Sequence, residues 1–264
     1  MALADFAAYR DALRAPHSDS LFNIGSTTAA AGRWYAPWAT LAPAGAVPTS
    51  AVVPTSATLG ANGSEGNNGV IGGRVNAMNP GVVLLCDKLS HQGGLSGVTT
   101  GAQTTNLPTA ALTRYTSAVG VMCMLNVYTQ IGTTATTVTV SYTNQAGTGG
   151  QTSPAVVIGG TGFREVPRAI LIPLAAGDTG FQSVESVTIA ATTGTAGNFG
   201  VTLFKPITAM IADEQHGVAV CGLISGRMVP GFAELDGTDP CLFMMAMSQS
   251  TNIMAAGAVL LTEW

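Results

Sequence analysis

The run Thr137-Val138-Thr139-Val140-Ser141-Tyr142 decides the fold class of this chain. Apolar and hydroxyl side chains alternate along it, so that Val138, Val140 and Tyr142 face one side of an extended strand and the hydroxyls face the other. Strict alternation of this kind is typical of a strand with one buried face and one face in water. The run therefore predicts an antiparallel β-sheet.

Similar short apolar runs, separated by Gly, Asn, Thr and Pro, occur on both sides of this stretch from about residue 69 onward. Regular spacing of short strands and turns is the pattern of a β-sandwich or a β-barrel. We therefore expect residues 69–264 to form one mainly β domain. The predicted strands are Val82–Cys86, Val119–Val127, Val138–Tyr142, Ala155–Ile158, Ala169–Leu174, Val184–Ala191, Val201–Phe204, Ala219–Ile224 and Leu242–Met247.

Local irregularities are also legible. The apolar residues Val184, Val187 and Ile189 break the alternation by one position, which predicts a β-bulge. Residues 144–147 and 177–180 contain the Asn, Asp and Gly that tight turns require. We predict turns at both places.

The first 68 residues differ in composition from the rest. Leu3, Phe6 and Leu13 recur at helical spacing and Pro16 ends the pattern, which predicts a short amphipathic helix over residues 2–15. From Pro16 to about Val70 the chain is rich in Ala, Pro, Thr, Ser and Gly. That composition favours an extended arm, so residues 1–68 are predicted to be a helix and arm.

Three aromatic residues in the arm, Trp34, Tyr35 and Trp38, are candidate interface residues. Large aromatic side chains bury much area at little entropic cost, which suits anchors on a partner surface. Capping of the chain's own β core is an equally weighted alternative. Deleting the arm separates the two, because an anchor is needed for binding and a cap for folding.

The charge content points to a packing role. Only 9% of the 264 residues are charged, against about a quarter in an ordinary soluble domain. Hydroxyl and methyl groups are more easily removed from water than unpaired charges, which suits a subunit of a lattice. We expect self-association, with an ordinary low-charge soluble protein as the alternative. The net charge of −4 and the scattered arginines disfavour a nucleic-acid partner.

The cysteines are widely separated and lack the Cys-x-x-Cys spacing of zinc or redox sites. We expect free thiols buried in the core, and hence assembly in a reducing cytoplasm, although disulfides stay possible by number. The four cysteines are Cys86, Cys123, Cys221 and Cys241.

The N-terminal residues do not resemble a secretory signal. The apolar stretch from Leu242 to Leu261 is interrupted at residues 248–252, so two strands are expected there and not a membrane span.

No motif for catalysis is visible. Asp213-Glu214-Gln215-His216, with Asp236 and Asp239 as further members, is the best candidate cluster. In a chain this poor in charge, a short acidic segment is more often a solvated loop or a salt bridge between subunits. Gly159-Gly160-Thr161-Gly162 lacks the residues of a phosphate-binding loop and is predicted to be a turn. We expect no enzyme activity, catalytic residue, metal or cofactor.

Two stretches, TATTVTVSYTNQAG and RAILIPLAAGDTGFQSVESVTIAATTGTAGNFGVTLFKPI, lie within Thr134–Ile207. In their Thr- and Gly-rich strands and their low charge they resemble accessory virion proteins of tailed bacteriophages, especially capsid decoration or cement proteins. The resemblance implies a jelly-roll-like sandwich, oligomers that are often trimers, and binding to the major capsid protein or other virion proteins. It implies a place in the virion, assembled in the host cytoplasm, with no membrane partner.

The long N-terminal arm departs from small cement proteins, so a tail, baseplate or head-fibre component is an alternative. A carbohydrate-binding adhesin is another, and it would need exposed aromatic residues on the sandwich. The resemblance assigns no functional residue.

Overall fold

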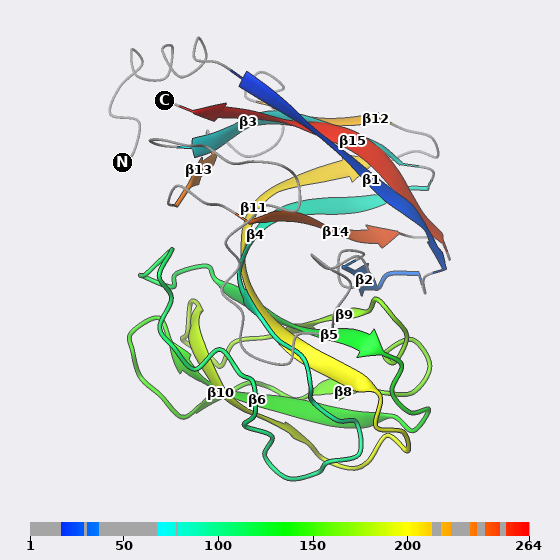
Figure 1. Cartoon of the computed structure of the whole chain (residues 1–264), viewed down its shortest axis with the longest axis vertical. Coiled ribbons are helices and arrows are strands. Elements are labelled where there is room, and N and C mark those ends of the chain that lie inside the picture. Colours follow the sequence, from blue (N-terminus) through cyan, green and yellow to red (C-terminus); the bar gives the residue numbers. More distant parts are fainter. Residues whose placement is uncertain are drawn as a thin grey trace. The chain divides into compact units, whose positions relative to one another are not determined.

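The structure is a computed structural model of the chain, mainly β and antiparallel, as predicted (Figure 1). No helix occurs among the described residues, and the helix predicted over residues 2–15 lies outside them. Backbone is described for residues 17–28, 31–36, 68–77, 79–212, 218–222, 233–236, 241–248 and 252–263. Side chains are described for residues 31–36, 79–211, 235–236 and 241–247.

The chain divides into two compact units, each assembled from separate stretches. Unit 1 comprises Met1–Gly32, Thr55–Asp87 and Ile207–Trp264, and unit 2 comprises Arg33–Pro54 and Lys88–Pro206. This partition does not follow the predicted boundary at residue 68. Composition shows where charge is scarce, but pairing between distant strands decides which stretches fold together.

Unit 1 contains an antiparallel sheet in the order β1-β15-β3-β12, with β13 also paired to β3 (Figure 1). A separate pairing joins β14 to the first part of β4, from Leu242 opposite Asp87 to Ser248 opposite Gly81. The bounds are β1 His17–Thr28, β3 Asn68–Ala77, β4 Gly81–His91, β12 Val218–Gly222, β13 Ala233–Leu235, β14 Leu242–Ser248 and β15 Asn252–Glu263.

Part of the predicted arm belongs to this sheet. Strand β1 pairs with β15 from His17 opposite Thr262 to Thr28 opposite Asn252. The sequence did not reveal β1, because its apolar residues Leu21, Phe22 and Ile24 are too few and are flanked by polar ones. Strands β14 and β15 confirm that the apolar stretch from residue 242 onward forms two strands.

Unit 2 has two antiparallel sheets (Figure 1). The inward side chains of both sheets belong to one core. One sheet has the order β10-β6-β7, with β8 also paired to β6, and in the other β5 pairs with both β9 and the first part of β11. The bounds are β2 Trp34–Tyr35, β5 Met122–Thr129, β6 Thr136–Asn144, β7 Gln151–Thr152, β8 Val156–Ile158, β9 Ala169–Ile172, β10 Phe181–Ile189 and β11 Asn198–Ala212.

The core confirms the alternation read from the sequence. Val138, Val140 and Tyr142 on β6 are fully buried. They belong to the same cluster as side chains of β5, β9, β10 and β11, and Phe181 of β10 packs on Tyr142 with ring centroids 4.4 Å apart. The prediction made from these six residues alone therefore identified the buried face of β6 correctly.

The predicted bulge and the turn at residues 144–147 are also confirmed, and the turn predicted at residues 177–180 lies two residues earlier, at Ala175–Asp178, where Asp178 N donates to Ala175 O (3.1 Å). The pairing of β10 with β6 shifts register between Val184 and Ser186. Gly147 and Gly177 have φ angles of 77° and 92°, a region that glycine reaches without strain. The glycines of the predicted turn at residues 159–162 also have positive φ, and Gly159 N donates to Phe163 O (3.1 Å).

Three cysteines, Cys86, Cys123 and Cys241, are buried and free, as expected of core thiols. Burial raises the pKa of Cys123, and burial together with the neighbouring Asp87 raises that of Cys86. Both thiols therefore stay protonated and unreactive while the fold is intact. The side chain of Cys221 lies outside the described residues.

Candidate interaction site

The structure places the predicted aromatic residue Tyr35 inside unit 2. Strand β2 meets the residues before β9 in an antiparallel bridge between Tyr35 and Arg168, and Ala36 N donates to Pro167 O (3.1 Å). The Arg168 guanidinium lies 4.2 Å from the centre of the Tyr35 ring, a cation–π geometry. Tyr35 is fully buried and Arg168 is 1% exposed.

Glu165, whose side chain is half-buried, completes this group. The Tyr35 hydroxyl donates to Glu165 Oε1 (2.9 Å), and Arg168 Nη2 donates to the Tyr35 hydroxyl (2.5 Å) and forms an ion pair with Glu165. Burial lowers the pKa of Arg168 to about 10, so that it remains a cation at neutral pH. Because a buried cation needs its partner, the group fixes the position of Tyr35.

The neighbouring aromatic residues are more accessible. Trp34 is half-buried, and exposed Arg33 stacks on the Phe163 ring at 4.0 Å from its centre. Trp38 lies outside the described residues. The interface role of Trp34, Tyr35 and Trp38 stays a prediction.

The sequence did not identify Glu165 and Arg168 as partners of Tyr35. The sequence does show that charge is concentrated here. The chain has 24 charged residues, 10 basic and 14 acidic, and three of them, Arg164, Glu165 and Arg168, lie within five positions. Such a local concentration of charge in a charge-poor chain marks an ion-pair group. It does not tell which aromatic residue the group will meet.

A second candidate surface is the outward side of the β6–β10 sheet, here called the hydroxyl face. On it Thr139 lies opposite Thr188 and Ser141 lies opposite Ser186. These four side chains are half-buried, and their inward neighbours on both strands, such as Val140 and Val187, belong to the core. The face consists of Thr137, Thr139, Ser141, Thr143, Ser186 and Thr188.

The β-bulge places one carboxylate on this face. Because the register shifts between Val184 and Ser186, Glu185 is the extra residue of β10 and points outward. Its oxygens accept hydrogen bonds from Thr143 Oγ1 (2.9 Å), Ser141 Oγ (3.1 Å) and Gly150 N (3.1 Å). The charge is thus satisfied within the sheet.

These contacts govern the protonation of Glu185. Burial alone would raise its pKa, but the hydrogen bonds from Gly150, Thr143 and Ser141 outweigh burial and lower it. A carboxylate with a lowered pKa contributes stability above the unfolded-state pKa of about 4.3, and this contribution is lost as pH falls through the lower folded-state pKa.

Replacing Glu185 with glutamine is expected to reduce the free energy of unfolding by about 1–2 kcal/mol at pH 7, because charged hydrogen bonds are stronger than neutral ones. The difference from the wild type should shrink as pH falls below 4, where the native carboxylate also becomes neutral. Urea denaturation at several pH values measures both effects. An equal difference at pH 7 and pH 3 would show that lost packing, and not charge, explains the change.

Other expected features fall partly outside the described chain. Residues 213–216 and Asp239 of the acidic segment are not described, and Asp236 is exposed. Within the described part, no three histidine, cysteine or acidic side chains gather as a metal site. The same part contains no helix that is long and apolar enough to cross a membrane.

Comparisons with known proteins do not assign this chain to a family. No family model and no curated protein matches the chain. Among solved structures, the chain is similar to "Infectious Bursal Virus Derived T=1 Particles", with 9% identity, a TM-score of 0.19, and coverage of 94% of this chain and 77% of that one. It is also similar to the "infectious bursal disease virus VP2 subviral particle", with 8% identity, a TM-score of 0.18, and coverage of 94% and 80%. TM-scores this low do not define a common fold.

Proposed function

We propose that this chain is a non-enzymatic structural protein of a tailed-bacteriophage particle, a decoration or cement protein that binds the outer capsid surface and stabilises it. In this proposal the two sheets of unit 2 are arranged as in a jelly roll, and copies of the chain associate with one another. The partner is the major capsid protein.

The observation that carries the proposal is the hydroxyl face. It is a regular sheet surface of threonine and serine whose single carboxylate, on Glu185, is already paired within the chain. Covering such a face removes no unpaired charge from water, so the desolvation penalty of docking is small. Hydroxyls can also exchange water for partner hydrogen bonds at little net change in energy.

The charge content of the whole chain supports the same conclusion. A protein with 9% charged residues has little electrostatic repulsion to keep copies apart or to oppose burial in a lattice. The Thr-rich strand β6 and strand β10 also lie within the stretch Thr134–Ile207 that resembles phage accessory proteins. Composition, the β6–β10 surface and the resemblance support one role.

The test places charge on the hydroxyl face. The double substitution Thr139→Lys and Thr188→Lys puts two ammonium groups opposite each other on the outer side of β6 and β10. Binding to particles that lack this protein should fall by about 100-fold or more, because unpaired charges at a buried interface cost several kcal/mol. Co-sedimentation with particles of the phage that encodes the chain measures binding.

A matched control uses Thr100→Lys and Thr105→Lys, which add the same charge at exposed loop positions of unit 2. This variant should bind like the wild type, and circular dichroism should show that both variants fold. Equal binding by the two lysine variants would contradict docking through the hydroxyl face.

A further inference from the structure

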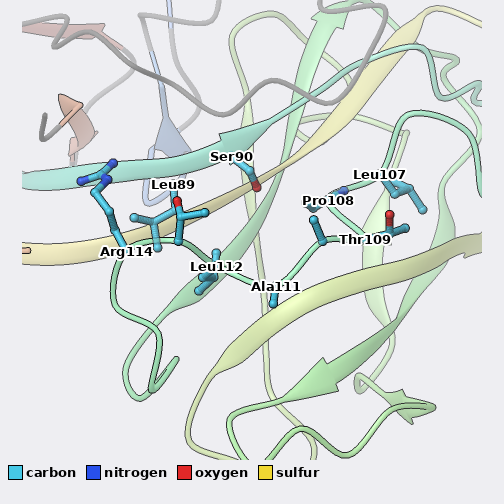
Figure 2. A pocket seen from close by; sticks show the side chains of 10 residues that line it. Leu89, Ser90, Leu107, Pro108, Thr109, Ala111, Leu112 and Arg114 are labelled. Atoms are coloured by element: carbon cyan, nitrogen blue, oxygen red, sulfur yellow. The ribbon is translucent and has the colours of Figure 1, made fainter. Parts of the chain in front are cut away.

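Unit 2 contains a pocket of about 110 Å³ between the end of β4 and the loop of residues 107–114 (Figure 2). Its walls include Leu89 on β4 and Leu107 and Leu112 on the loop. Leu89 and Leu107 are 5% and 3% exposed and belong to the core of unit 2. One wall of the pocket is therefore the core of unit 2, and exposed loop residues such as Thr109 and Ala111 form its outer side.

The loop that closes the pocket is held in place at several points. Arg114 Nη2 donates to Lys88 O (3.0 Å) and Val184 N donates to Pro108 O (2.9 Å). Asn106 and Tyr115, on either side of the loop, have φ angles of 55° and 50°, a region that residues other than glycine seldom adopt. A strained and anchored loop keeps its shape when the pocket is empty, which favours a preformed binding site.

Ser90 supplies a polar group without a partner. Its side chain is 6% exposed, and its Oγ has no hydrogen bond to any described residue. Figure 2 shows this oxygen pointing into the space between Leu89 and the loop. Burying a hydroxyl without a hydrogen bond costs free energy. A ligand atom that forms a hydrogen bond with Ser90 Oγ removes this cost, which favours binding.

We infer that the pocket binds a small, uncharged, mainly apolar molecule whose one polar atom hydrogen-bonds to Ser90 Oγ. The volume of about 110 Å³ is smaller than the about 150 Å³ of an enclosed apolar cavity that takes up benzene, so the ligand is no larger than one ring, part of which stays at the open side of the pocket. No acidic residue is among the described residues that line it, and the Arg114 guanidinium is directed at Lys88 O. A neutral ligand follows from this lining. The inference goes beyond the proposed function and does not depend on it.

The probes are p-cresol, which has one ring and one hydroxyl, and toluene, which lacks the hydroxyl. Titration of the full-length chain with each probe is followed through the methyl NMR signals of Leu89, Leu107 and Leu112. Both probes should shift these signals in a saturable way at millimolar concentration. Replacing Ser90 with alanine should weaken the binding of p-cresol by about 5- to 10-fold more than the binding of toluene, because p-cresol loses one neutral hydrogen bond.

A blocking variant completes the test. Ala111→Phe adds a ring at the loop side of the pocket, where the residue is exposed and can be changed without disturbing the core. It should abolish the shifts caused by both probes. Absence of saturable shifts in the wild type would overturn the site and leave it occupied by water only. Equal weakening of p-cresol and toluene in Ser90→Ala would overturn the hydrogen bond to Ser90.

Discussion

Replacing Gly200 with alanine is expected to destabilise unit 2 by on the order of 4 kcal/mol or more, enough to unfold it at ordinary temperatures. A Cβ atom at Gly200 would lie 1.6 Å from Gln92 O and 2.7 Å from Gly93 Cα. Both contacts are with backbone, which cannot rotate away as a side chain can. The chain must shift to relieve them.

That shift would disrupt the pairing beside Gly200. Gln92 N donates to Val201 O (3.1 Å), and Leu95 and Phe199 exchange two backbone hydrogen bonds (2.9 and 3.1 Å). Leu95 and Phe199 are also buried in the core of unit 2, so that moving the strand opens the core as well. One methyl group thus removes several interactions at once.

Gly101→Ala is the matched control. Gly101 has no atom within 4 Å of its Cβ position and no positive φ. The same substitution there should leave stability unchanged or raise it by a few tenths of a kcal/mol, because alanine restricts the unfolded chain. Thermal unfolding followed by circular dichroism compares the two variants. A Gly200→Ala protein that melts like Gly101→Ala would mean that residues 92–93 do not lie against β11.

We expect His91 to make the protein less stable in acid, and to do so at pH values well above the pKa of the carboxylates. Burial, together with nearby Lys88, lowers the pKa of His91 from 6.5 to about 3. The unfolded chain therefore binds a proton below pH 6.5 while the folded chain does not. Stability should fall as pH decreases from 6.5 towards 3, with a loss of about 2 kcal/mol by pH 5.

Substituting His91 with glutamine separates this effect from that of other groups. Glutamine does not titrate, so the variant should lack the decline of about 1.6 kcal/mol that His91 causes between pH 6.5 and pH 5, whatever its stability at pH 7. Urea denaturation at both pH values gives the comparison. If the wild type and His91→Gln lose the same free energy over this interval, His91 is protonated in the folded state and the assigned burial is wrong.

Local structure was the part of the fold that the sequence could predict. The alternation of apolar and polar residues predicted which face of β6 is buried, and one break in the alternation predicted the bulge in β10. Both features depend only on residues that are close together along the chain. Strand β3 was missed for the same reason. Glycine in Asn68–Ala77 hides the alternation, and pairing with the distant strands β12 and β15 makes this stretch a strand.

The site was less predictable than the fold. The pattern of Trp34 and Tyr35 marked an aromatic group, but burial of Tyr35 against Arg168 joins residues 133 positions apart. No local signal specifies such a contact. Glu185 shows the converse, since a locally readable bulge determines where its carboxylate lies, while its hydrogen-bond partner Thr143 belongs to a different strand.

Cryo-electron microscopy of the intact particle tests the central claim most directly, because it shows the chain in its place. The proposal predicts density for this chain on the outer capsid surface, repeated with the lattice, with the hydroxyl face of β6 and β10 against the major capsid protein. Purified particles that contain no copy of the chain would contradict a structural role. Particles that carry it with the hydroxyl face turned to solvent would contradict the docking surface.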